Sequence, residues 1–300
     1  MQNQGTENGA AGPLREALTA CTAAGLSGTL RVTGEPGGAI HLAGGRVSAI
    51  ETPGAPSPEV LLLRSHRVTE SGWDAAFAAA ASAGGPMSTE LTVRGMVGAG
   101  ELEALLRTAL ADAMFVLASG SVAECQAEPG TVDYVLPLYP AAEADALLAE
   151  AARRIRVLAA LPGPGRTDRI IAAPGMMRPG VRLGDGQDEI LALADGRRTS
   201  RDLAFALGRG VYATILQLAR MHEAGLLVTA AQRDAPPSAG GAPGRPAADD
   251  GRAGSLPRRQ RDQPALARRP WAPGRAPEMR TPLGLLRPRA GRDAGPGEPS

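Results

Sequence analysis

The side chains that acid–base, nucleophilic or metal chemistry would need are few and scattered in this sequence. The three histidines are His41, His66 and His222, and the two cysteines are Cys21 and Cys125. No set of them has the spacing of zinc ligands. Two cysteines far apart with no partner pattern are typical of reduced thiols in a cytosolic protein. These residues predict no metal site.

Two further patterns come close to a catalytic or phosphate-binding motif and lack its context. Ser65, His66 and Asp74 are the residue types of a hydrolytic triad, but no Gly-x-Ser-x-Gly elbow accompanies them. The glycines at 34–38 and 44–45 are not followed by a helix, so they do not form a phosphate loop and are better read as hairpin turns. We therefore expect no catalytic residue, no cofactor and no enzymatic activity.

A local basic cluster is the sharper signal. Five arginines and two aspartates lie between Asp195 and His222. On a helix over 211–224, helical spacing turns Val211, Ile215, Leu218 and His222 inward and leaves the polar side chains outward. A glutamine side chain can form bidentate hydrogen bonds with adenine, and an arginine side chain can do so with guanine or can contact a phosphate. The candidate DNA-contacting residues are Arg197, Arg198, Thr199, Arg201, Arg209, Gln217 and Arg220.

The elements that would position this cluster form a helix-turn-helix with at most a small wing. A short helix over 188–194 ends at Asp195-Gly196, and a second begins after Thr199, whose side chain can form a capping box with Asp202. Gly208-Arg209-Gly210 then turns the chain into the helix that ends at Gly225. An apolar strand follows over 226–228. We predict a winged-helix-like domain over 166–230, which binds either DNA or a protein.

The first part of the chain, 13–98, predicts an α+β domain. A helix over 13–25 precedes an antiparallel meander of strands over 28–33, 39–42 and 46–50. Helices follow over 59–66 and over 70–83, the second with Trp73 and Phe77 turned inward, and then a brief strand over 90–94. Arg46 and Glu51, at the ends of the third strand, are read as a solvated strand edge in preference to a ligand surface.

Residues 99–165 predict a helical connector with one strand. A long helix from Gly100 to Gly120 has an apolar stripe over 102–117 that would serve an internal core or a homodimer equally well. Alternating apolar residues over 131–138 predict a strand. The helix over 143–160 that follows turns Arg153, Arg154 and Arg156 mostly outward.

The two ends of the sequence have the composition of disordered segments. Residues 1–12 are polar and glycine-rich, and residues 231–300 contain half of the 26 prolines. From Gln232 onward 13 arginines face seven acidic residues, so the rest of the chain has net negative charge and is no general polyanion binder. No secretory signal and no apolar run of about 20 residues is present. We therefore expect no membrane association and a cytoplasmic location.

The stretch GTLRVTGEPGGAIHLAGGRVSAIETPG, with the two helices after it, resembles the PatA-type N-terminal domain of bacterial regulatory proteins. The segments LLAEAARRIRVLAAL and DGRRTSRDLAFALGRGVYATILQLARMHEAGLL resemble the helical and winged-helix-like parts that follow it in actinobacterial members. The resemblance covers about 14–228 and implies a signalling role beside response regulators or small GTPases, with no catalytic residues. The Asp-Gly-x-x-Thr element is also similar to small winged-helix folds that bind peptides.

The sequence thus predicts an α+β protein: an antiparallel meander with packed helices, a helical connector, a C-terminal winged-helix-like domain and a disordered tail. Its predicted function is that of a non-enzymatic cytoplasmic regulator. The N-terminal module would receive a protein partner, and the helix-turn-helix would contact DNA as a transcriptional regulator. The alternative is a signalling adaptor in which both parts bind protein.

Overall fold

A computed structural model describes residues 12–131, 134–164, 168–173, 183–184 and 186–230. The predictions of disorder for 1–12 and 231–300 lie outside these residues, apart from Gly12, which begins the first helix. The fold is α+β, as the sequence predicts, and contains one antiparallel four-stranded sheet and one smaller three-stranded sheet. Both sheets belong to the same compact unit of the chain.

The four-stranded sheet contains the predicted meander. Strands β1 (Gly28–Glu35), β2 (Gly38–Ala43) and β3 (Arg46–Glu51) follow one another through two tight turns. Each pairs antiparallel with its neighbour, and the strand order is β3-β2-β1-β4. Leu30, Ile40 and Val47 point into the core, as the period-two alternation of apolar residues predicts. The meander is therefore confirmed.

The fourth strand is not where the alternation of apolar residues placed it. Strand β4 (Ser121–Pro129) pairs antiparallel with β1, so Cys125 lies in a strand and not beside a turn. The predicted strand over 131–138 is wrong: its described residues form bends and irregular backbone. Leu136 and Leu138 are nevertheless buried, so burial rather than pairing accounts for their apolar character. β4 escaped prediction because an edge strand with mostly exposed side chains needs no apolar face.

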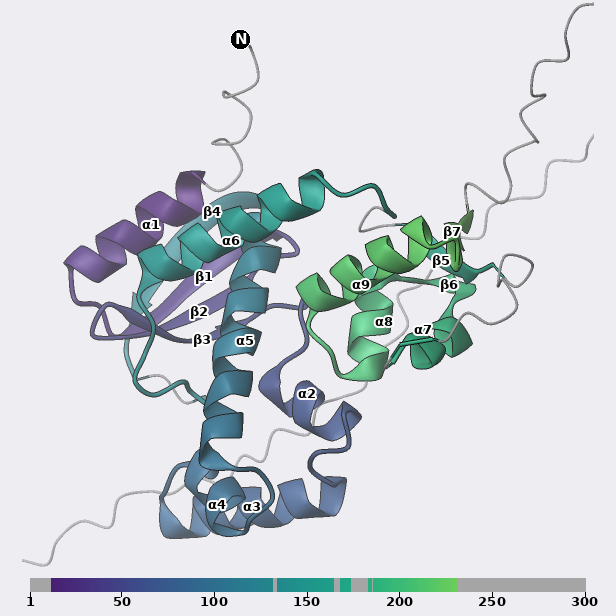
Figure 1. Ribbon diagram of the computed structural model, residues 1–300. Coiled ribbons are helices and arrows are strands. Elements are labelled where there is room, and N and C mark those ends of the chain that lie inside the picture. Colours follow the sequence, from purple (N-terminus) through teal and green to yellow (C-terminus); the bar gives the residue numbers. More distant parts are fainter. Residues whose placement is uncertain (1–11, 132–133, 165–167, 174–182, 185, 231–300) are drawn as a thin grey trace, which may run out of the picture. The chain divides into compact units, whose positions relative to one another are not determined.

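Helices α1 (Gly12–Ala23) and α5 (Ala99–Ala118) pack on the four-stranded sheet, and α6 (Ala144–Ala159) packs on both of these helices (Figure 1). The apolar stripe of α5 is buried within the chain, from Leu102 to Leu117. The stripe therefore fills an internal core, and the homodimer stays a prediction.

Three further helices connect β3 to α5: α2 (Pro58–Arg64), α3 (Glu70–Ala83) and α4 (Met87–Val93). The predicted brief strand over 90–94 is wrong, because these residues form the end of α4 and the turn after it. Met87 and Leu91 are buried at the i, i+4 spacing of a helix. Phe77 was predicted to turn inward, but its side chain is exposed. Trp73 and Ala76 contribute the buried face of α3 instead.

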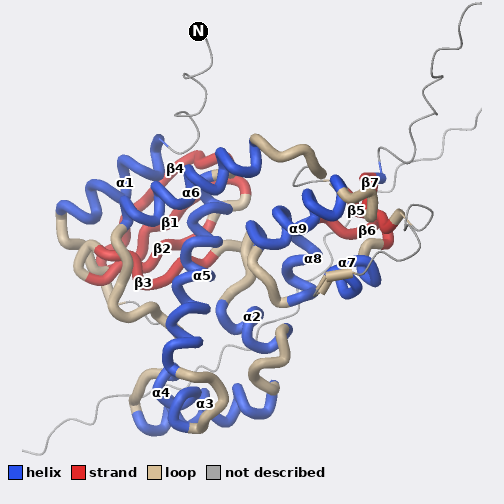
Figure 2. Tube along the Cα trace, in the orientation of Figure 1, coloured by secondary structure: helices blue, strands red, loops and turns tan. Residues whose placement is uncertain are grey.

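The C-terminal part combines a helix-turn-helix with a three-stranded sheet (Figure 2). Its order is β5 (Arg169–Ala172), α7 (Gln187–Leu193), β6 (Asp195–Thr199), α8 (Ser200–Leu207), α9 (Val211–Glu223) and β7 (Leu227–Thr229). Asp195-Gly196, predicted as a turn, begins β6. Two strands beyond the predicted one, β5 and β6, complete the sheet. A small core joins these elements, formed by Ile170, Ile190, Ala194, Leu203, Leu218, Met221, Leu226 and Leu227.

No helix in the described part of the chain is both long and apolar enough to cross a lipid bilayer.

Candidate interface around helix α9

Helix α9 has no capping side chain of its own at its N-terminal end. The cap position is Gly210, and the free amides behind it need an acceptor from elsewhere. Asp112 of α5 provides that acceptor. The N–H of Val211 donates to Asp112 Oδ2 at 2.6 Å, and the N–H of Tyr212 donates to Oδ1 at 2.9 Å. A carboxylate about 100 residues away in the sequence therefore caps this helix.

The carboxylate of Asp112 is buried, with only 3% of the residue exposed. Burial raises the pKa of Asp112, since the charged form loses its hydration. The two amide hydrogen bonds and the charge of Arg154 act in the opposite direction and favour the carboxylate. The positive end of the helix dipole acts in the same sense as these bonds. The buried charge is thus stabilised from three sides.

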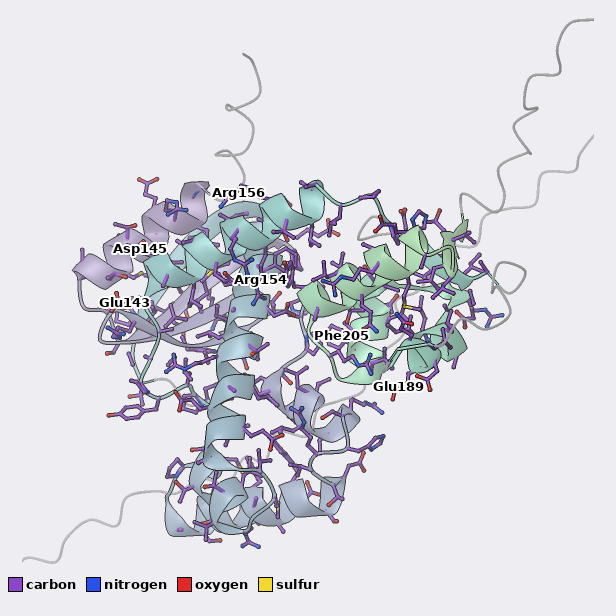
Figure 3. The ribbon with its side chains drawn as sticks, viewed as in Figure 1. Glu143, Asp145, Arg154, Arg156, Glu189 and Phe205 are labelled. Atoms are coloured by element: carbon purple, nitrogen blue, oxygen red, sulfur yellow. The ribbon has the colours of Figure 1, made fainter. Side chains whose placement is uncertain are left out.

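Arg154 of α6 completes the arrangement (Figure 3). Its Nη1 lies 3.5 Å from Asp112 Oδ1, and its guanidinium carbon lies 4.8 Å from the centre of the Tyr212 ring. The Tyr212 ring meets Phe115 edge-on, with 5.7 Å between the ring centres. Glu150 accepts from Arg153 and also from Arg154, and these bonds lower the pKa of Glu150 to about 2. Helices α5, α6 and α9 therefore meet at one charged and aromatic cluster.

Sequence reasoning missed this cluster. Arg154 was predicted to face mostly outward, but its side chain is only 12% exposed. A signal was nevertheless present, because Asp112 is a charged residue within the broad apolar stripe of α5. A buried aspartate on an apolar face requires partners, and those partners lie on other helices that the sequence does not bring together. Arg153 and Arg156 are exposed, as predicted.

The side chains of four of the seven candidate DNA-contacting residues form hydrogen bonds within the C-terminal part of the described chain. Thr199 and Asp202 form the predicted capping box at the start of α8, which is confirmed. Arg198 donates to Asp195 at 2.9 Å and to the carbonyl of Leu193 at 3.1 Å.

Arg209 and Gln217 are the other two. Arg209 Nη2 pairs with Glu189 Oε2 at 2.5 Å, and its Nη1 lies 3.3 Å from the carbonyl of Gly186. Gln217 Oε1 lies 3.5 Å from Arg209 Nη1, so its amide is turned toward the domain and half-buried. The prediction that Gln217 points freely outward is therefore wrong. The reason is the ion pair between Arg209 and Glu189, which holds Arg209 beside the Gln217 side chain.

The remaining three candidates, Arg197, Arg201 and Arg220, are exposed. They come from β6, α8 and α9. The guanidinium carbon of Arg201 lies 5.9 Å from the ring centre of Phe205, a loose contact. Of the inward face predicted for α9, Val211, Ile215 and Leu218 are buried.

His222 is only half-buried, and Met221 takes its place as the fully buried residue of the last turn. Arg46 and Glu51 also have internal partners. Arg46 pairs with Glu143, and Glu51 lies 3.3 Å from His41. These contacts are compatible with the solvated strand edge that the sequence predicted. Among the described residues no group of three or more His, Cys, Asp or Glu side chains is arranged to hold a metal ion.

Comparison with known proteins finds no match to this chain, whether with family models, curated proteins or solved structures. The resemblance to PatA-type proteins stays a prediction.

Proposed function

We propose that the chain is a regulatory adaptor that binds protein partners and that its winged-helix-like domain docks protein rather than reads DNA. One observation carries this proposal: the start of α9 is built into the contact with α5. In helix-turn-helix proteins the N-terminal residues of the second helix contact base edges in the major groove. Val211 is only 3% exposed, and both α9 amides at this end already donate to Asp112. A helix held in this way presents little of its usual reading end.

A surface formed by α4, α5 and the segment before α6 suits a protein partner. Tyr139 is 90% exposed and Val93 is 78% exposed, which is unusual for large apolar side chains. Tyr139 lines a hollow of about 220 Å³ together with Thr92 of α4 and Leu102 of α5. Tyrosine is enriched at protein interfaces because its ring supplies contact area and its hydroxyl a hydrogen bond. This surface is where we expect the partner to bind.

The test is affinity capture with the full chain after nuclease treatment, compared with a variant carrying Val93→Ser and Tyr139→Ser. A protein retained by the wild type and lost by the variant supports the adaptor. The matched control is Thr19→Ser, an exposed position on α1 away from the hollow. If the variant and the wild type retain the same proteins, the proposed surface is wrong.

DNA contact is the second candidate, and the exposed arginines favour it. Arg197, Arg201 and Arg220 carry positive charge on the same small domain. Such residues supply phosphate contacts whose strength falls as salt rises. A fluorescence titration on genomic fragments separates the two proposals. Sequence-selective binding that is lost when Gln217 and Arg220 become alanine favours DNA reading. Binding without sequence preference, unchanged in that variant, favours the adaptor.

A further inference from the structure

A cavity of about 600 Å³ opens between the end of α2, the start of α5 and the turn that joins α8 to α9. Its volume lies within the range of small-molecule sites. The walls are in firm contact, because Gly208 packs against the backbone at Ser65: a Cβ at Gly208 would lie 2.7 Å from the Ser65 nitrogen. Apolar side chains line part of the cavity, namely Leu61, Leu105 and Leu207.

Positive charge gathers in this cavity. Arg64, Arg67 and Arg209 line it, against two carboxylates. Arg67 Nε lies 3.3 Å from Glu101, and Arg209 is paired with Glu189. Within the described part of the chain, the guanidinium of Arg64 has no hydrogen bond or ion pair. Three guanidinium groups thus outnumber the carboxylates, and one of them is available to a ligand.

His66 lines the same cavity in an unusual backbone conformation. Its φ is 58°, and it is the one non-glycine residue with positive φ among those the structure describes. It follows the end of α2, where Arg67 N–H donates to the carbonyl of Leu62 five residues back. A helix end of this type places a residue in the left-handed region, where glycine is favoured.

The other helix ends of this type in the described chain show that glycine is this protein's ordinary solution. α1, α3, α4, α8 and α9 each end with the same hydrogen bond to a carbonyl five residues back. In each case a glycine occupies the left-handed position: Gly25, Gly84, Gly95, Gly208 and Gly225. Only α2 carries a side chain there, and that side chain is an imidazole at the cavity. Backbone strain of this kind is typical of functional sites.

From these observations we propose that the cavity binds a small molecule carrying a phosphate group, held by Arg64 and His66 beside the paired arginines Arg67 and Arg209. A doubly charged phosphate suits this set better than a carboxylate. Arg67 and Arg209 already hold one carboxylate each, so a ligand carboxylate would only duplicate those partners. A phosphate adds charge and further acceptor oxygens for donors that arrive from separate elements. The leucines of the wall accept the organic part of the ligand.

The proposal does not rest on the adaptor function. Ligand binding at this cavity and partner binding at Tyr139 and Val93 involve different residues, so either can fail alone.

The experiment is a ³¹P NMR titration of the full-length chain with phenyl phosphate and, separately, with inorganic phosphate. We expect saturable line broadening with both probes and tighter binding of phenyl phosphate, because its ring packs on the leucines. His66→Gly should weaken phenyl phosphate binding about tenfold, as should Arg64→Gln, since each removes a donor to a charged group. His66→Gly should also melt at or above the wild-type temperature, because glycine tolerates the left-handed backbone.

Arg156→Gln is the matched control, because Arg156 is an exposed arginine of α6 outside the cavity (Figure 3). The arginines of residues 232–300 are present in every variant, so their non-specific binding cancels in the comparison. An affinity that is unchanged in both His66→Gly and Arg64→Gln overturns the proposal. So does an equal loss in Arg156→Gln, and so does the absence of saturable broadening with either probe. Equal affinity for the two probes overturns the part assigned to the leucines.

Discussion

The two ends of α9 are held in different ways. The N-terminal end has no capping side chain of its own and takes its acceptor from Asp112 of α5, and Val211 belongs to the large core. The C-terminal end closes locally on Gly225, and Met221 belongs to the smaller of the two cores. Helix α9 therefore bridges the two cores, and its bonds to Asp112 fix its first turn. The part left to a partner is therefore the exposed side that includes Arg220.

The largest expected effect comes from removing the acceptor at the fixed end. Asp112→Ala leaves two amides of α9 and the guanidinium of Arg154 without their shared partner in a buried site. We expect the free energy of unfolding to fall by about 4 kcal/mol, as for other broken buried pairs. Urea unfolding measures it. Asp145→Ala is the control, because Asp145 is exposed on α6 and should change stability by less than about 0.5 kcal/mol. Equal losses of unfolding free energy in the two variants would show that Asp112 does not fix the N-terminal end of α9.

The turn before α9 provides the next test. Gly208 and Gly84 both end helices with φ near +60°, but only Gly208 has backbone within reach of an added Cβ. Gly84→Ala should cost about 1 kcal/mol through the left-handed backbone alone. Gly208→Ala should cost about 3 kcal/mol, because the methyl group also pushes α8 away from α2. Thermal unfolding of the two variants gives the difference. Similar costs at the two sites would mean that α2 moves aside freely.

The contact between Arg154 and Tyr212 is weaker. A double-mutant cycle with Arg154→Met and Tyr212→Leu should give a coupling energy of about 1 kcal/mol, the size of a partly desolvated cation–π contact. Replacing Arg154→Met by Arg156→Met in the same cycle should give a coupling near zero. A negligible coupling for Arg154 would show that Asp112 alone fixes the start of α9.

The smallest effect is a dependence on pH at the edge of the same cluster. Folding lowers the pKa of Glu150 from 4.5 to about 2, chiefly through its bond with Arg153. This contribution is fully present above pH 4.5 and is lost as the pH falls toward 2. Because Glu150 is partly exposed, we expect it to be only about 1 kcal/mol. The difference in unfolding free energy between the wild type and Glu150→Gln should shrink over that interval. A difference in unfolding free energy that stays constant between pH 4.5 and pH 2 would contradict the lowered pKa of Glu150.

Asp112 acts in the opposite sense. Folding raises its pKa, so the free energy of unfolding decreases as the pH rises from the ordinary carboxyl value of 3.8 toward the raised one. The comparison of Glu150→Gln with the wild type at each pH cancels this contribution.

Local signals predicted the local features. The capping box of Thr199 and Asp202 and the glycine that ends α9 depend on residues a few positions apart, and both are confirmed. The meander was predictable because its turns and alternation lie within one short stretch. Sequence periodicity also identified α3 to the residue.

Features that depend on distant residues were not predictable in this way. β4 pairs with β1 across about 90 residues and has few buried side chains to mark it. The partners of Asp112 lie on α6 and α9, and helical periodicity places Arg154 on the polar side of its own helix. The orientation of Gln217 also depends on a distant residue, because its partner Arg209 is held by Glu189 from α7. The partners of such residues come from distant parts of the chain, so the local sequence pattern does not predict whether their side chains are buried.

Amide hydrogen exchange at Val211 and Tyr212 tests the central claim most directly. A solvated start of a helix exchanges quickly, because its first amides have no partner within the helix. If α9 is fixed on Asp112, these two amides should exchange as slowly as those of the core helix α5, through unfolding of the whole unit. Exchange of Val211 and Tyr212 at the rate of an exposed helix end would contradict the account.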